Sequence, residues 1–210
     1  MVDSKKTNVE VLRNAESLIH KMDYELKELN DPKCKLKMST LMNFITDGRS
    51  VTWAVQKQKS KIPDFDNWYK KHQDEMRGDP LLRYFVEVRN EIEKEGVIRA
   101  SSGIGINNLY AGDLIRDNKP PEEYKNYVKS FFMCDRLGGS GWDIVLPDGT
   151  ELKHYIELPE DKCIINVRLG GLPKTHLGKN IEGLTTVEIC QLYVDYLRNI
   201  VNSAKKQFAN

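Results

Sequence analysis

The stretch DPLLRYFVEVRNEIEKEG, residues 79–96, carries the clearest helix signals in the chain. Asp79 can accept hydrogen bonds from the first free N–H groups of a helix, and Pro80 suits the first helical position because it has no N–H to lose. Gly96 can adopt the left-handed conformation that ends many helices. Apolar residues recur between them at steps of three and four: Leu81, Leu82, Phe85, Val88 and Ile92. The stretch therefore predicts an amphipathic helix with one buried face.

The same periodicity predicts three helices before this one: residues 8–30, 36–59 and 64–76. Asp64 or Asp66 is expected to cap the third of them. Gly48 lies in the middle of the second, where glycine costs about 1 kcal/mol relative to alanine, so it predicts a kink or a close helix crossing. Four helices with short connections are typical of an antiparallel bundle.

After Gly96 the pattern becomes that of β-structure. Short apolar and β-branched runs predict strands at residues 97–106, 130–134, 142–146, 151–158 and 163–169. The sequence Pro147-Asp-Gly-Thr150 predicts a hairpin, Gly138–Gly141 a turn, and residues 172–183 a loop. A last helix is expected from Thr185 or Thr186, because Thr185-Thr-Val-Glu188 fits a capping box.

These elements predict an α+β fold, in which an antiparallel helical bundle carries a β-rich insert and a C-terminal helix packs back on the bundle. The predicted divisions are a bundle over residues 1–96, an insert over 97–183 and the C-terminal helix over 184–210. Within the insert, Trp142, His154 and Tyr155 predict either a binding surface or ordinary cross-strand pairs of a hairpin.

Composition excludes several classes of function. The net charge is +1, with 32 Lys and Arg against 31 Asp and Glu, whereas dedicated polyanion binders usually carry a clear basic excess. The sequence therefore gives no signal of DNA binding. No apolar run reaches the roughly 18–20 residues of a membrane span, and the start of the chain shows no signal peptide. The four cysteines form no C-x-x-C, which favours reduced thiols in a cytoplasmic protein.

No cofactor or metal site is expected. The four histidines are widely spaced and form none of the usual zinc-ligand patterns. Gly103-Ile-Gly105 lacks the third glycine of a dinucleotide fingerprint, and Gly138-Gly-Ser-Gly141 lacks the lysine of a P-loop.

The candidate site residues lie at the end of the 79–96 helix. Asn90 and Lys94 are four positions apart and share a helix face, close to Arg89. Three such groups near a helix end could converge on a phosphate or a base. The alternative is a solvated last turn, in which Glu93 and its acidic neighbours surround Lys94.

Arg89-Asn90 followed by a basic residue at Lys94 resembles the signature of the HEPN superfamily, in which Arg-Asn-x-x-x-His closes a helix. That family comprises helical bundles, some of which are metal-independent RNases and toxins with a dimeric site. The resemblance implies catalytic roles for Arg89, Asn90 and Lys94, with lysine in place of the histidine. A lysine near its usual pKa of about 10.4 is a poor general base, so the motif is degenerate.

The chain also resembles a group of uncharacterised bacterial proteins, through residues 79–85, 94–96, 138–142 and 175–178. That group implies no established activity. The degenerate HEPN-like motif implies a non-catalytic interaction or RNA-binding protein whose partner is a protein or RNA. The alternative is a metal-independent RNase or toxin that acts as a homodimer through Arg89, Asn90 and Lys94.

Overall fold

The structure is a computed structural model that describes residues 3–59, 62–106, 110–133, 135, 139–157 and 163–208. The fold is α+β, as predicted. The chain divides into two compact units, called here the bundle unit (residues 1–103 and 165–210) and the insert unit (residues 104–164). In the described parts of the chain, no helix is long and apolar enough to cross a membrane.

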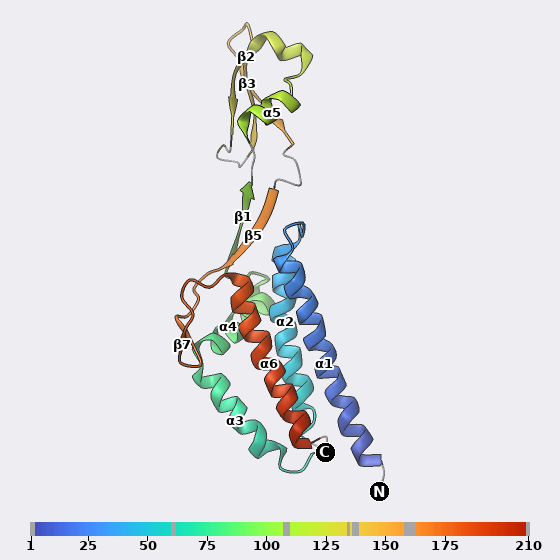
Figure 1. Ribbon diagram of the computed structural model, residues 1–210. Helices are drawn as coiled ribbons and strands as arrows, with labels where there is room; N and C mark the ends of the chain where they lie inside the picture. The colour runs from blue at the N-terminus through green and yellow to red at the C-terminus, as the bar shows by residue number, and fades with distance from the viewer. Residues whose placement is uncertain are drawn as a thin grey trace. The chain divides into compact units, whose positions relative to one another are not determined.

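The bundle unit consists mainly of five helices: α1 (Asp3–Asn30), α2 (Lys37–Gln56), α3 (Phe65–Gly78), α4 (Pro80–Glu95) and α6 (Thr186–Phe208). Helices α1, α2 and α6 lie side by side along the bundle (Figure 1). The C-terminal helix therefore packs back on the bundle, as predicted. The core that these helices share is continuous and contains the apolar stripe of α4.

Helix α4 begins and ends as the sequence predicts. The Asp79 carboxylate accepts a hydrogen bond from the Leu82 N–H at 2.9 Å, Pro80 takes the first helical position, and Gly96 ends the helix with φ of 68°. The capping box of α6 is also confirmed. The Thr185 N–H donates to the Glu188 carboxylate at 2.7 Å, and the Glu188 N–H donates back to the Thr185 hydroxyl at 3.3 Å.

The expected side-chain cap of α3 is wrong. Asp64 occupies the N-cap position with a left-handed backbone, φ 58°, and its side chain makes no capping hydrogen bond. A capping side chain normally reaches the helix N–H groups from an extended backbone, which this conformation does not provide. Asp66 lies in the first turn and forms an exposed ion pair with Lys59.

Residues 172–183 contain a small hairpin where a loop was expected. Strand β6 (Thr175–His176) pairs antiparallel with β7 (Lys179–Asn180). Leu177 and Gly178 form its tip with φ of 47° and 75°. Strands of two residues are too short to leave a periodic pattern in the sequence, which explains why the hairpin was missed.

The insert unit holds a three-stranded antiparallel sheet in the order β2 (Val128–Phe132), β3 (Ser140–Val145) and β4 (Glu151–Ile156). The β3–β4 hairpin is confirmed. Ser140 and Gly141 belong to β3 and not to a turn, while Gly138, Cys134 and Leu158 lie outside the described residues. Two short helices were not predicted, α5 (Ala111–Asp117) and the 3₁₀ helix η1 (Glu122–Tyr127).

Trp142 is a core residue of this sheet. It is buried, it is the cross-strand partner of His154, and its indole N–H donates to the Asn118 carbonyl at 2.9 Å. Trp142 and His154 therefore form a structural pair. Strands β1 (Ala100–Ile106) and β5 (Cys163–Leu169) form a separate two-stranded sheet, through which the chain leaves and re-enters the bundle unit.

Candidate functional site

A close crossing of α2 and α6 at Gly48 builds the floor of the candidate site. A Cβ atom at Gly48 would lie 2.4 Å from the Tyr193 ring and 2.6 Å from its hydroxyl, so only glycine lets the ring rest on α2. Phe85 of α4 stacks on the other face of Tyr193, with ring centroids 4.0 Å apart and planes at 10°. The three helices thus fix the position of the Tyr193 hydroxyl. The close crossing predicted at Gly48 is confirmed.

Two arginines lie next to Tyr193. Arg49 follows Gly48 on α2, and Arg89 comes one helical turn after Phe85 on α4. The Nε atoms of both arginines are buried and have no acceptor in the described parts of the chain. Buried donors without partners are uncommon in native proteins, because each costs about 1–3 kcal/mol. Two such donors close together make this position a candidate site for a group that carries acceptors.

The charges of the two arginines are only partly balanced. Arg89 forms an ion pair with Glu93, one turn further along α4. Arg49 donates to the Thr52 hydroxyl at 3.2 Å and has no carboxylate partner among the described residues. The site therefore holds two guanidinium groups and one carboxylate, an excess of one positive charge in a half-buried position.

Trp53 lies beside both guanidinium groups. Its ring centroid is 4.9 Å from Cζ of Arg49 and 5.8 Å from Cζ of Arg89, within the range of cation–π contacts. The ring thus contacts both guanidinium groups, whose Nε–H groups have no acceptor among the described residues. Of the Trp53 side chain and backbone surface, 47% is exposed.

A narrow cavity opens between these groups, and its volume is about 40 Å³. It is called here the arginine pocket; apolar side chains from α2, α3, α4 and α6 form most of its wall, and Arg49, Thr52, Arg89 and Tyr193 provide its polar atoms. One buried water needs roughly 10–15 Å³ of such space, while pockets for whole ligands span about 300–1,000 Å³. The arginine pocket fits a compact charged group, not an entire ligand.

The electrostatics of the arginine pocket favour an anion. Burial raises the pKa of Tyr193 well above its ordinary value, although the nearby charges of Arg49 and Arg89 act in the opposite direction. The hydroxyl therefore stays protonated and can donate. The pocket presents donors from two guanidinium groups and one phenol, which is a suitable set for an oxyanion, while the Thr52 hydroxyl donates to the Arg49 carbonyl at 2.8 Å.

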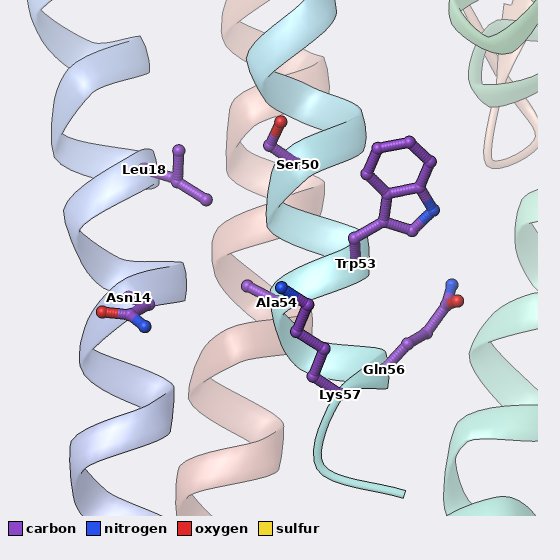
Figure 2. Close-up of a pocket in the computed structure, with 7 residues that line it drawn as sticks. All are labelled: Asn14, Leu18, Ser50, Trp53, Ala54, Gln56 and Lys57. Atoms are coloured by element: carbon purple, nitrogen blue, oxygen red, sulfur yellow. The ribbon is translucent and has the colours of Figure 1, made fainter.

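A wider groove adjoins Trp53 on the surface of α1 and α2. It has a volume of about 510 Å³ and is called here the α1–α2 groove; its lining is Asn14, Leu18, Ser50, Trp53, Ala54, Gln56 and Lys57. Figure 2 shows Asn14 and Leu18 on α1 across from Ser50 and Ala54 on α2, and Trp53 projecting from α2 away from α1.

The structure separates the three residues that the sequence singled out. Arg89 lines the arginine pocket, with 12% of its side chain exposed. Asn90 is half-buried and Lys94 is exposed, and neither lines that pocket. The partners of Arg89 in the pocket are Arg49, Thr52 and Tyr193, which sequence reasoning missed. Gly48 was the available signal, since a glycine inside a helix marks a close approach of another side chain.

The comparisons with known proteins point to a phage family. Residues 19–116 match the family model described as bacteriophage lambda protein ea47. Protein ea47 of Escherichia phage lambda is 32% identical over 85 residues, which is 40% of this chain and 20% of that protein. The chain thus covers about a fifth of the length of this curated relative. No solved structure matches the chain.

These matches overturn the resemblance to the HEPN superfamily and to the uncharacterised bacterial proteins. Residues 19–116 match the ea47 family model and include α2 and α4. Arg89, Asn90 and Lys94, which resembled the HEPN motif, lie in α4. The physical reason for the error is the shortness of the motif. Arg, Asn and Lys are common in the charged last turn of any helix, where Arg89 pairs with Glu93 and Lys94 is exposed.

Proposed function

We propose that this protein is a non-catalytic binding protein and that its arginine pocket takes an anionic group of the partner. The observation that carries the proposal is the pair of buried Nε donors of Arg49 and Arg89. They find no acceptor among the residues that the structure describes, and the pocket holds an excess positive charge. A bound anion would satisfy both donors and balance the charge. It would therefore remove a cost that the free protein bears.

The chemistry of the arginine pocket favours a phosphate. Arginine presents its N–H groups as a planar fork, which suits two oxygens of one oxyanion. A phosphate has oxygens that point in several directions, so it can meet forks from two sides and accept from the Tyr193 hydroxyl as well. The two oxygens of a carboxylate lie in one plane, so they meet a single fork well and a second one from another side less well.

The charge distribution favours binding of a single phosphate group over binding along the backbone of a polyanion. The insert unit, residues 104–164, carries seven Lys and Arg against eleven Asp and Glu. The bundle unit carries 25 against 20, a modest excess that is spread over five helices. Binding dominated by many phosphate contacts would need a larger basic surface.

The sequence predicts a protein or RNA as the partner, and this stays a prediction. Of the two, RNA carries a phosphate on every nucleotide, so we favour it for a phosphate pocket. The alternative, cleavage of RNA by a homodimer through Arg89, Asn90 and Lys94, also stays a prediction. An RNA-cleavage assay in metal-free buffer, with Arg89→Ala and Lys94→Ala beside the unmodified chain, tests it. Cleavage that both substitutions abolish would establish the RNase and contradict the non-catalytic proposal.

The anion site itself is tested by ligand-linked stability. Inorganic phosphate should stabilise the protein against urea by RT ln(1 + [L]/Kd), about 2.7 kcal/mol at a hundredfold excess over Kd. Arg49→Met should lose most of this stabilisation and remain folded. Arg83→Met is the matched control, because Arg83 is exposed on the same α4 helix as Arg89 and does not line the pocket. Equal stabilisation of all three proteins would contradict the proposal.

A further inference from the structure

Trp53 is unusual among the three tryptophans of the chain. Trp142 is buried and Trp68 is half-buried, whereas Trp53 leaves 47% of its surface exposed on α2. An exposed indole that is fixed by two guanidinium groups is a rigid aromatic surface beside a charged pocket. Aromatic side chains in such settings stack with planar ligand groups.

The α1–α2 groove supplies polar atoms next to that aromatic surface. The side chains of Asn14, Ser50 and Lys57 make no hydrogen bond or ion pair with the other residues that the structure describes. An amide, a hydroxyl and an ammonium together offer donors and acceptors to the edge of a heterocycle. Leu18 and Ala54 add apolar contact, and the volume of about 510 Å³ lies within the range of small-molecule sites.

Trp53 is the wall that the α1–α2 groove shares with the arginines of the pocket. Trp53 of α2 therefore lines the α1–α2 groove and also contacts the two arginines that line the arginine pocket. A ligand in which a short linker joins a planar heterocycle to a phosphate could place the heterocycle against Trp53 and the phosphate in the arginine pocket. Among the residues that line the groove in the described structure, Lys57 is the one with a positive charge. A groove with so little positive charge suits a nucleobase better than a second phosphate.

We propose that the site binds a nucleotide, with the base against Trp53 and the α1–α2 groove and the phosphate in the arginine pocket. The ligand is a free nucleotide or one nucleotide of a single strand, since a duplex keeps its base faces covered. The inference rests on the proposed phosphate site and adds the base to it. If Trp53 only covered the two arginine side chains, the site would bind inorganic phosphate and a nucleotide with equal affinity.

The test compares inorganic phosphate, ribose 5-phosphate, AMP and a single-stranded adenosine pentamer by titration calorimetry and tryptophan fluorescence. AMP should bind roughly tenfold or more tightly than ribose 5-phosphate, because stacking of a base contributes about 1–3 kcal/mol. AMP should also quench the fluorescence of Trp53. Tighter binding of the pentamer than of AMP identifies a single strand as the source, and weaker binding identifies a free nucleotide.

Trp53→Leu keeps an apolar cover on the arginines and removes the stacking surface. It should lower the affinity for AMP by roughly tenfold more than it lowers the affinity for inorganic phosphate, because AMP carries a base to stack and phosphate does not. Trp68→Phe, in the bundle core, is the control for fluorescence and should leave both affinities unchanged. Circular dichroism checks that each variant is folded.

The outcomes separate the two proposals. Equal binding of AMP and ribose 5-phosphate, or a Trp53→Leu variant that loses no more affinity for AMP than for inorganic phosphate, would overturn the nucleotide inference while the anion site stands. Binding of none of the four ligands would overturn both.

Discussion

The carboxylate of Asp79 lies 2.9 Å from Nδ1 of His176, and both side chains are buried. The other carboxylate oxygen accepts from the Leu177 N–H at 2.6 Å. The residue that caps α4 therefore also fixes the β6–β7 hairpin. His176 in turn packs edge-on against Tyr196 of α6, whose hydroxyl donates to Glu75 at 2.9 Å. The Asp79 carboxylate thus links α4 directly to the β6–β7 hairpin, and it links α4 to α6 through His176.

We predict that Asp79→Asn destabilises the protein by about 2–3 kcal/mol in urea denaturation. The substitution weakens the cap and leaves the buried groups of His176 and Leu177 poorly matched. Asp64→Asn is the matched control, because Asp64 stands at the N-cap of α3 without a side-chain capping bond, and it should change stability by less than about 0.5 kcal/mol. Equal effects of the two substitutions would contradict the role given to Asp79.

The contribution of Asp79 should depend on pH. Burial alone would raise its pKa, but hydrogen bonds from Leu177, His176 and Leu82 outweigh burial and hold the pKa below its ordinary value. A carboxyl group with a lowered folded-state pKa stabilises the protein above its unfolded pKa of about 3.9, and this stabilisation is lost as pH falls through the folded pKa. The stability difference between the unmodified chain and Asp79→Asn should therefore shrink below about pH 4.

Gly48→Ala should destabilise the protein by about 1–2 kcal/mol, although alanine is the better helix former by about 1 kcal/mol. The reason is steric, because the new Cβ would lie 2.4 Å from the Tyr193 ring. Gly78→Ala, at the end of α3 with no atom within 4 Å of the added Cβ, should be neutral or slightly stabilising. Thermal unfolding followed by circular dichroism measures both. A stabilised Gly48→Ala variant would show that the crossing of α2 and α6 is looser than described.

Glu25 should make the protein less stable as pH rises. Burial and the charge of Asp47 raise the pKa of Glu25 to about 7, and the nearby Lys21 opposes the shift. Because the folded pKa is raised, the folded state binds the proton more tightly, and stability falls as pH increases from about 4.5 through about 7.

Glu25→Gln resembles the protonated form, so it should stabilise the protein at pH 8 by on the order of 1–2 kcal/mol and change little at pH 5. Urea denaturation at a series of pH values measures this, with Glu28→Gln on the same helix as the control. A stability difference that is the same at pH 5 and pH 8 would show that Glu25 titrates normally.

The helices could be predicted because their signals are local. Asp79, Pro80 and Gly96 set the ends of α4 through their own backbone preferences, and the apolar spacing shows its buried face. The hairpin tip at Leu177 depends instead on the distant Asp79 carboxylate. Asp64 has the residue type of a cap, but tertiary structure gives it a left-handed backbone.

The candidate site depends on helix packing, which a single sequence does not show. Arg89 was selected for its spacing to Asn90 and Lys94, yet its neighbours in the pocket come from α2 and α6. Tyr193 looks in the sequence like any apolar position of the last helix. Only Gly48 gave a sign of the close crossing, and it did not identify the residue that crosses there.

The Nε–H groups of Arg49 and Arg89, which have no acceptor in the described part of the chain, are the proposed phosphate ligands. The most direct measurement is a phosphate titration of ¹⁵N-labelled protein, in which the arginine Nε–H resonances are assigned with Arg49→Met, Arg89→Met and Arg83→Met. We predict that the Nε–H resonances of Arg49 and Arg89 shift together with one saturation curve, while that of Arg83 stays in place. Resonances of Arg49 and Arg89 that do not move, or that move no more than that of Arg83, would contradict the account.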